Sequence, residues 1–147
     1  RLHGLVAYVF AFFDAMLSFR HQKIKIQYNQ KIRQISPFVF LVSNTNQQGY
    51  DFTVNPTAKT NDGKLDLFWM EKSSLFAKLK FFFSAMLRKK LRGSEFNSVP
   101  VNSLKISLIN QDDFCLQVDG EYVPCSEKTL EVKVLPKKLK VIFTGIT

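Results

Sequence analysis

Short apolar segments separated by turn residues recur along this chain and limit what it can fold into. Residues 23–28 alternate with period two, so that Ile24, Ile26 and Tyr28 share one face, as in a half-buried strand. Residues 38–42 are apolar throughout, which is typical of a strand covered on both sides. Further strand-like runs follow at residues 65–70, 104–109, 114–118, 130–134 and 139–143. The pattern predicts a mainly β fold, an antiparallel β-sandwich, rather than alternating β-α-β units.

Two segments have a helical pattern instead, and the first covers about residues 4–19. It has no proline or internal glycine and is rich in Leu, Ala, Met and Phe, with Asp14 and Ser18 expected on its wetter side. The apolar run is marginal in length for a membrane span and is interrupted by His3 and Asp14. We therefore expect a buried helix.

The second helix is expected at about residues 74–91, with Ser73 or Ser74 as its N-cap and Gly93 as its stop. Two arrangements fit its pattern: a helix packed on the sandwich with solvated basic residues, or an amphipathic helix lying on an anionic bilayer. The apolar stripe comprises Leu75, Phe76, Leu79, Phe82, Phe83, Met86 and Leu87, and the basic residues expected on the other side are Lys78, Arg88, Lys89 and Arg92.

The length and composition limit how large a core the chain can bury and which kinds of partner it can bind. Its 147 residues, 46% of them hydrophobic, can bury the core of one domain, and we treat residues 1–147 as a single domain. The start at Arg1, followed directly by an apolar helical pattern, leads us to expect a fragment of a longer protein. A net charge of +9 predicts a surface that attracts anions. Because the sequence has no RNA-recognition, helix-turn-helix or paired zinc-ligand motif, it argues against nucleic acid as the partner.

The two cysteines, Cys115 and Cys125, do not form a Cys-x-x-Cys pair, so neither a zinc site nor a redox motif is supported. They flank an Asp-Gly turn almost symmetrically and would lie nearly opposite each other in a tight hairpin. A disulfide is open in principle, and two buried thiols are the preferred interpretation.

The segment Val-Asp-Gly-Glu-Tyr at residues 118–122 lies between two apolar-alternating runs. Its Asp-Gly pair first indicates an ordinary hairpin turn with positive φ at the glycine. A second interpretation is chemical: Asp119, held rigidly at a hairpin tip with Glu121 two residues later, could accept the proton of an attacking hydroxyl. The spacing alone leaves both interpretations open.

Residues 56–67 form a second group of interest, in which a loop turns at Gly63 and enters a strand at once. Asp62 can cap that turn through its own side chain. Alternatively, the Asp62 carboxylate and the loop carbonyls can surround a hard cation such as Mg²⁺, with water completing the shell.

These motifs, taken in order, resemble the bacterial diacylglycerol kinase and sphingosine kinase superfamily. A Pro-x-Ala loop runs into Asn-Asp-Gly-x-Leu-Asp-Leu at residues 56–67, Asp-Gly-Glu follows at 119–121, and Val-x-x-Leu-Pro-x-x-Leu-x-Val ends the series at 132–141. The resemblance spans about residues 24–143. Each motif alone is weak, but the ordered set is fairly specific.

The resemblance implies a two-domain lipid kinase that uses ATP and Mg²⁺ to phosphorylate a hydroxyl of diacylglycerol or a related lipid. In that plan an N-terminal domain carries a Gly-Gly-Asp-Gly-Thr nucleotide loop, and a C-terminal β-sandwich, the second domain of the NAD kinase/diacylglycerol kinase-like fold, supplies the other wall of the cleft. No Gly-Gly-Asp-Gly-Thr stands in this chain, so we expect it to be the C-terminal lipid-substrate domain and to be inactive alone. The expected partners are the lipid and the protein's own nucleotide-binding domain, in the cytoplasm with peripheral membrane contact; homo-oligomerisation is left open.

Carried over residue by residue, the family's catalytic acid falls on Asp119, as general base for the lipid hydroxyl, with Glu121 as its supporting acid. The family's magnesium site falls on Asp62, with the backbone carbonyls of Lys59 and Lys64 as further ligands. Positioning and charge neutralisation dominate phosphoryl transfer, so these residues are parts of a site rather than a whole one.

Asn44, directly after the apolar run at residues 38–42, is implied as a cofactor-binding residue. Where many relatives have a run of glycines after this Asn, only Gly49 remains here, so the loop cannot bring its backbone as close to a phosphate or headgroup. The lipid substrate is therefore not identified by the sequence. A rival hypothesis is a non-catalytic β-sandwich module that binds a membrane surface or a protein partner, and NAD kinase is a third, smaller alternative.

Overall fold

The computed structural model describes residues 2–18, 22–48, 52–55, 58–71, 74–89, 91–109, 114–135 and 138. Within these ranges every strand pair is antiparallel, and two helices accompany the strands. The elements in chain order are α1 (Leu2–Ser18), β1 (Ile24–Tyr28), β2 (Lys31–Ile35), β3 (Pro37–Ser43), β4 (Gln47–Gln48), β5 (Phe52–Thr53), β6 (Leu65–Glu71), α2 (Leu75–Met86), β7 (Phe96–Val101), β8 (Ser103–Leu108), β9 (Phe114–Val118), β10 (Glu121–Cys125) and β11 (Thr129–Lys133). The predicted mainly β, antiparallel sandwich with two helices is confirmed.

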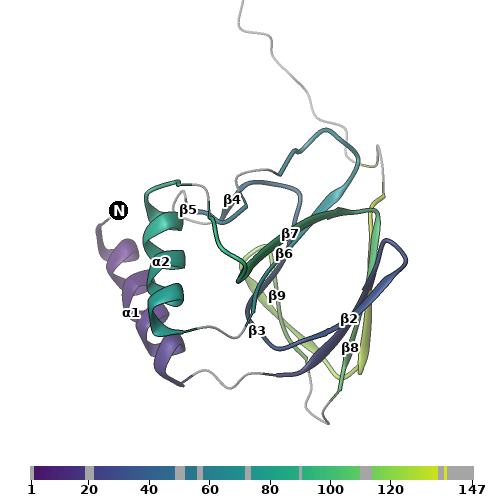
Figure 1. Cartoon of the computed structure of the whole chain (residues 1–147), viewed down its shortest axis with the longest axis horizontal. Helices are drawn as coiled ribbons and strands as arrows, with labels where there is room; N and C mark the ends of the chain where they lie inside the picture. Colours follow the sequence, from purple (N-terminus) through teal and green to yellow (C-terminus); the bar gives the residue numbers. More distant parts are fainter. Residues whose placement is uncertain are drawn as a thin grey trace, which may run out of the picture.

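The sheets and helices form layers (Figure 1). The three-stranded sheet β3, β6, β7 is the middle layer, with the helices α1 and α2 on one flank. On its other flank lie the four-stranded sheet β11, β8, β1, β2 and the hairpin β9–β10. The short pair β4–β5 stands apart from these sheets. The middle sheet is therefore covered on both faces.

Strand β6 shows how one sequence run serves two cores. Its alternate residues Leu67 and Trp69 belong to the cluster between the sheets, whereas Phe68 and Met70 belong to the cluster under the helices. Successive side chains of a strand point to opposite faces, so a strand covered on both sides must be apolar at consecutive positions. The same holds for β3, where the prediction of a strand covered on both sides is confirmed.

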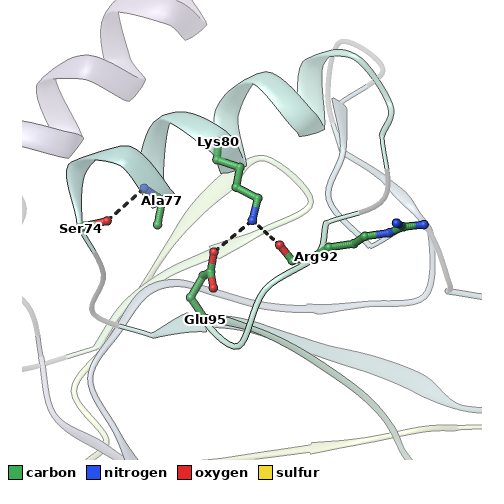
Figure 2. Close-up of polar contacts among 5 residues, drawn as sticks. All are labelled: Ser74, Ala77, Lys80, Arg92 and Glu95. Atoms are coloured by element: carbon green, nitrogen blue, oxygen red, sulfur yellow. Dashed lines mark hydrogen bonds and ion pairs between the residues drawn. The ribbon is translucent and has the colours of Figure 1, made fainter.

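Helix α2 begins as predicted and ends earlier. Ser74 is its N-cap, and its hydroxyl accepts a hydrogen bond from the Ala77 backbone N–H at 3.3 Å (Figure 2). The last helical residue is Met86, so the predicted extent to residue 91 and the stop at Gly93 are wrong.

The early end of α2 has a clear backbone cause. Arg88 has a left-handed φ of 54°, and its N–H donates to the Ala85 carbonyl while the Lys89 N–H donates to the Ser84 carbonyl. This pair of bonds is the Schellman motif, which usually places glycine in the left-handed position. Because an arginine stands there, no glycine marks the end of the helix in the sequence.

The predicted apolar stripe of α2 does not pack on the sandwich as a unit. Of that stripe the helix buries Phe82, and it also buries Ala77, Phe81 and Ala85 from outside the stripe. Lys78, expected on the solvated side, lies over the Phe38 ring and donates to the Met16 carbonyl at 3.4 Å. Since α2 is apolar around most of its circumference, periodicity alone could not select the buried side. The residues of the predicted stripe that are exposed are Leu75, Phe76, Phe83, Met86 and Leu87.

The segment after α2 is tied back to the helix. The Lys80 ammonium lies 3.4 Å from the Glu95 carboxylate and also donates to the Arg92 carbonyl (Figure 2). The Arg92 side chain points away from this contact (Figure 2). The connection to β7 is therefore held against α2 by one lysine.

Helix α1 follows the predicted segment with small shifts at both ends. Asp14 and Ser18 are exposed, as expected, and the Ser18 hydroxyl donates to the Asp14 carbonyl. The expectation of a buried helix is only half right, because Phe10 and Leu17 are also exposed while Phe12 packs on the core beneath the helices. Among the described residues, no helix has the length and apolar character needed to cross a bilayer.

Strands β2 and β7 were not predicted, nor were the two-residue strands β4 and β5, and the predicted run at residues 139–143 lies outside the described residues. In the β9–β10 hairpin the register pairs Cys115 with Pro124, and Cys125 pairs with Phe114. The two cysteines are therefore not opposite each other in the register, and Cys125 is a half-buried free thiol.

Candidate functional site

The first group of candidate residues stands at the tip of the β9–β10 hairpin. Asp119 and Gly120 have φ values of 50° and 95°, and Val118 pairs with Glu121 across the turn. Positive φ at both central residues is the type I′ geometry that matches the twist of two antiparallel strands. Gln117 supports the turn, since its side-chain amide donates to the Gly120 carbonyl at 3.3 Å. The hairpin interpretation of this segment is confirmed.

The hairpin is fixed at its base and open at its tip. Phe114 is buried in the core between the sheets, and Cys125 packs against the same core. Asp119, Glu121 and Tyr122 are exposed at the other end. A carboxylate on such a tip has a defined backbone position and is reachable by a substrate, which suits a base that accepts a hydroxyl proton.

The second group lies in the loop that leads into β6. The Asp62 carboxylate accepts a hydrogen bond from the Lys64 backbone N–H at 3.0 Å, so the predicted capping role is confirmed. Asp62, Lys59 and Lys64 are all exposed. Pro56 and Thr57, which belong to the same sequence motif, lie outside the described residues.

Asp66, the second residue of β6, is an acid that the sequence did not single out as a candidate. It is only 5% exposed, and burial raises the pKa of its carboxyl, with the nearby Asp62 charge raising it further. Hydrogen bonds from the Lys59 backbone and the Asn55 side chain act in the opposite direction. One carboxyl oxygen of Asp66, Oδ2, is buried and has no hydrogen-bond partner within the described part of the chain.

A buried polar network continues from Asp66 into the sandwich. Asn55, 1% exposed, lies beside Asp66, whose carboxyl pKa it lowers, and accepts a hydrogen bond from the Ser98 hydroxyl at 3.0 Å. Buried polar side chains are normally hydrogen-bonded, so this chain of contacts fixes the Asp66 carboxyl beneath the loop. The signal in the sequence was the acid between two leucines, at the start of a strand that is apolar from Leu67 to Met70.

The oxygen donors around this loop fit a small hard cation. Asp62 and Asp66 are two carboxylates close enough for the Asp62 charge to raise the pKa of Asp66, and the backbone carbonyls of Lys59 and Lys64 are the further ligands that the resemblance implies. Mg²⁺ prefers such oxygen ligands together with several waters. No group of three or more His, Cys, Asp or Glu side chains gathers within the described ranges, so carbonyls and water would have to complete the shell. The observation that supports a cation at this place is the buried Oδ2 atom of Asp66, which has no hydrogen-bond partner within the described residues.

Asn44 lies at the same end of the middle sheet as this loop. Ser43, the last residue of β3, pairs with Asp66, so the chain after β3 and the chain before β6 meet there. Asn44 is exposed. The turn between β1 and β2 also reaches this end, because the Asn29 side chain donates to the carbonyl of Pro100, the residue paired with Asp66 in β7. The register therefore brings Asn44 and the loop of residues 58–64 together.

The hairpin tip and the loop are separate groups. Within the part of the chain that the structure describes, no hydrogen bond or ion pair joins Asp119 or Glu121 to Asn44, Asp62 or Asp66. The chain thus presents two acidic groups, one exposed on a turn and one partly buried at the end of a sheet.

Comparison with known proteins relates this arrangement to one family. The family model described as "YegS C-terminal NAD kinase beta sandwich-like domain" matches residues 1–143. A curated relative, diacylglycerol kinase of Bacillus subtilis (strain 168), is 26% identical over 119 residues, which is 81% of this chain and 39% of the relative.

Solved structures share the fold. A putative diacylglycerol kinase from Bacillus anthracis str. Sterne superposes with a TM-score of 0.60 at 18% identity over 86% of this chain and 47% of that one. A second structure, of a diacylglycerol kinase from the same organism, gives a TM-score of 0.57 at 17% identity over 84% of this chain and 46% of that one. This chain therefore spans less than half the length of each of these proteins.

Proposed function

This chain belongs to the family of YegS C-terminal NAD kinase beta sandwich-like domains, and from that membership we propose that it is the lipid-substrate domain of an ATP-dependent lipid kinase. The reaction is transfer of the γ-phosphoryl group of ATP to a hydroxyl of diacylglycerol or a related lipid. The observation that carries the proposal is the match over 81% of the chain to a protein named diacylglycerol kinase.

In the proposed reaction Asp119 is the general base. The lipid hydroxyl gives its proton to the Asp119 carboxylate as its oxygen bonds to the γ-phosphorus, and ADP leaves with the electrons of the broken P–O bond. The rigid type I′ turn supports this role because it fixes the backbone of Asp119 while leaving the carboxylate exposed. Glu121, the first residue of β10, is the supporting acid at the same tip.

Mg²⁺ and ATP are the proposed cofactors. Bound Mg²⁺ would neutralise charge that develops on the phosphoryl oxygens or, at a site remote from ATP, hold the loop in a competent form. In this chain Asp62, Asp66 and the carbonyls of Lys59 and Lys64 would hold the ion. Asn44, at the same end of the sheet, would contact the nucleotide.

The test is phosphate transfer by the full-length protein. We expect radiolabel from γ-labelled ATP to appear in the lipid extract when diacylglycerol and Mg²⁺ are present, and to be lost when Mg²⁺ is omitted. We expect no turnover by the isolated chain, because the nucleotide loop of the family is not part of it. Failure of the full-length protein to label any lipid in an untargeted lipid panel would overturn the proposal.

A second candidate function is a non-catalytic module that binds a membrane surface or a protein partner. It is favoured by the apolar side chains that α1 and α2 expose, which a purely catalytic role does not require. In that case Asp62 and Asp119 are only turn residues. A full-length protein that binds its partner normally but transfers no phosphate would favour this candidate.

A further inference from the structure

Asn55 is a buried amide that precedes the loop of residues 58–64. Its side chain is 1% exposed, which is also the exposure of the apolar core residues Trp69 and Leu104. Its neighbour Val54 packs in the core beneath the helices. Burial of an amide costs free energy unless polar groups of the protein contact it. The polar contacts of Asn55 therefore indicate what holds it in this place.

Asn55 makes contacts with three separate parts of the chain. Its side-chain carbonyl accepts a hydrogen bond from the Ser98 hydroxyl of β7 at 3.0 Å. Its backbone carbonyl accepts a hydrogen bond from the Ala58 N–H at 3.1 Å, where the loop starts. Its side chain also lies beside the Asp66 carboxyl of β6. One residue therefore joins β7, the loop and β6.

The pairing of β6 with β7 explains why Asn55 can reach both strands. Ser98 pairs with Phe68, and Asp66 lies two positions before Phe68. Phe68 packs in the core beneath the helices. Because residues two apart in a strand share a face, and paired residues do as well, Asp66 and Ser98 lie on the helix-covered face of the middle sheet. Asn55 therefore bridges two neighbouring strands on this face.

The start of the loop is held at two consecutive residues. The Ala58 N–H is bonded to the backbone of Asn55, and the Lys59 backbone is bonded to the Asp66 carboxyl. The Lys59 carbonyl is one of the ligands expected for the cation. Its position therefore depends on Asn55 directly, through Ala58, and on the Asp66 carboxyl that lies beside Asn55.

The other end of the loop is held in a different way. The Asp62 carboxylate accepts a hydrogen bond from the Lys64 backbone N–H at 3.0 Å, so this end is closed by the loop itself. The start of the loop has no such local closure among the contacts described above, and it is fixed to the sheet through Asn55. Loss of Asn55 should therefore displace one part of the cation site and leave the other part in place.

We propose that Asn55 is a positioning residue for a divalent cation bound by this loop. It holds the start of the loop through Ala58 and keeps the Asp66 carboxyl beneath the loop, so that the ligands are in place when the cation arrives. It contacts neither the cation nor the substrate. The inference rests on the cation site of the proposed function and adds the residue that shapes this site. Residues that orient the ligands of a metal change its affinity by about 10–100-fold when they are mutated.

Direct ligation by Asn55 is the main alternative, since amide and backbone oxygens also bind hard cations. Its side-chain oxygen already accepts the Ser98 bond, and its backbone oxygen accepts the Ala58 bond. The two roles differ in what Ser98 contributes. A positioning residue needs the Ser98 hydroxyl as its anchor, whereas a ligand is freed from a competing bond when that hydroxyl is removed.

The experiment measures Mn²⁺ binding to the full-length protein without ATP, through loss of the EPR signal of the free ion. Mn²⁺ takes the same oxygen ligands as Mg²⁺. Asp62→Ala defines the part of the signal that belongs to the loop. The test variants are Asn55→Ala and Ser98→Ala. The matched hydroxyl control is Ser107→Ala on the other sheet, where Ser107 Oγ lies 3.1 Å from Thr129 Oγ1.

A second control separates a loss of affinity from a loss of stability. Asn29→Ala also removes an asparagine side chain with a tertiary hydrogen bond, at 2.9 Å to the Pro100 carbonyl, but this side chain does not hold the loop. Melting curves are recorded on the same samples. Asn29→Ala should melt earlier than the wild type and bind Mn²⁺ as the wild type does.

Asn55→Ala is expected to weaken Mn²⁺ binding by the loop about 10–100-fold, because the start of the loop and the Asp66 carboxyl lose their common support. Ser98→Ala should give a smaller loss, since Asn55 stays in place and only its anchor on β7 is removed. Ser107→Ala should bind as the wild type does. The order of affinities is therefore wild type and both controls, then Ser98→Ala, then Asn55→Ala.

Wild-type affinity of Asn55→Ala, or equal losses in Asn55→Ala and Asn29→Ala, would overturn the proposal. Unchanged or tighter binding by Ser98→Ala would also overturn it, and with weak binding by Asn55→Ala it would make Asn55 a ligand. If Asn55→Ala does not fold, Ser98→Ala decides the question. Equal Mn²⁺ binding by the wild type and Asp62→Ala would remove the loop cation from the proposed function together with this inference, whereas the other outcomes leave the proposed function standing.

Discussion

Two hairpins of this chain turn through the same backbone geometry and use it differently. The β1–β2 turn has Asn29 and Gln30 at φ values of 44° and 63°, and the β9–β10 turn has Asp119 and Gly120 at 50° and 95°. The Asn29 side chain donates to the Pro100 carbonyl at 2.9 Å and so ties its turn to β7. Within the described residues the Asp119 side chain makes no such hydrogen bond to another strand, and the bond that supports this turn comes from Gln117.

The difference separates a structural turn from a candidate catalytic one. At the first turn the polar side chain is engaged in holding two sheets together. At the second turn the Gln117 side chain supports the backbone. The carboxylate of Asp119 is therefore not needed to stabilise the turn and is available for chemistry. A residue that the fold does not use can be changed without unfolding the domain, and this makes the comparison testable.

Asp119→Asn in the full-length protein should give the largest effect, on turnover. We expect the rate of phosphate transfer to fall about 10²–10⁴-fold, because an amide cannot accept the hydroxyl proton. Stability should stay within about 0.5 kcal/mol of wild type, since Asn before Gly suits a type I′ turn. Initial rates at saturating ATP give the first number and urea unfolding gives the second. Glu127→Gln, at another exposed acid, is the matched control and should change neither.

Asp66→Ala should show the opposite behaviour to Asp119→Asn, namely a large change in stability. Removing the buried carboxyl leaves the Lys59 backbone N–H without its acceptor and the buried Asn55 side chain without its polar neighbour. The free energy of unfolding should fall by about 1–3 kcal/mol. Urea unfolding of the full-length variant checks this, and a loss smaller than that of Asn29→Ala would mean that the Asp66 network does not hold the loop.

The pH dependence of the unfolding free energy should show that the pKa of Asp66 is raised in the folded state. Burial, and then the Asp62 charge, raise the pKa of Asp66 in the folded state above its ordinary value of 3.8. The folded state then binds the proton more tightly, so the Asp66 contribution is fully present below the unfolded pKa and is lost as pH rises through the folded pKa. With Mg²⁺ chelated, wild-type stability should therefore decline across that window relative to Asp66→Asn. Parallel stability curves for the two proteins would contradict the raised pKa.

Asn29→Ala should weaken the fold and leave turnover unchanged. The variant loses the bond to Pro100 and places a residue that disfavours left-handed geometry at φ 44°. We expect a loss of about 1 kcal/mol in unfolding free energy. Thermal melting measures it, and the same preparation serves for the turnover assay.

Gln30→Gly should give the smallest effect, a gain in stability. Gln30 adopts a φ of 63° without the freedom of glycine, whereas Gly120 occupies the corresponding place in the other hairpin. Asn-Gly is a preferred pair for this turn, so we expect a stabilisation of about 0.5–1 kcal/mol. A lower melting temperature for Gln30→Gly would show that the two turns are not equivalent.

The sequence predicted the parts of the fold whose pattern and packing agree. Strand β1 alternates because only one face is buried, and β6 is apolar at every position from Leu67 to Met70 because both faces are. The Ser74 cap and the Asp119-Gly120 turn were found from local chemistry that tertiary contacts do not alter. Each of these features is determined by residues that lie within a few positions of it in the sequence.

The features that were missed depend on residues far apart in the chain. Strand β2 is exposed at every position except Ile35 and so has no alternation, and β7 includes Pro100 and two polar residues. The end of α2 was hidden because Arg88 occupies a place that glycine usually marks. The buried side of α2 was not identified because both sides of that helix are apolar.

The candidate site was predicted in part. Asp62 and Asp119 stand in the turns that the sequence indicated, and their roles in a reaction stay predictions. Asp66 and Asn55 were not foreseen, since their burial follows from the pairing of β6 with β3 and β7 and from contacts with Ser98. Local motifs locate turns, but only the fold shows which acids lie beneath them.

The most direct test of the account measures turnover and melting temperature together for Asp119→Asn and Asn29→Ala in the full-length protein. The account predicts that Asp119→Asn loses phosphate transfer to diacylglycerol at an unchanged melting temperature, and that Asn29→Ala melts earlier with wild-type turnover below its melting transition. Wild-type turnover by Asp119→Asn would contradict it, because the exposed carboxylate of the β9–β10 turn would then have no part in the reaction.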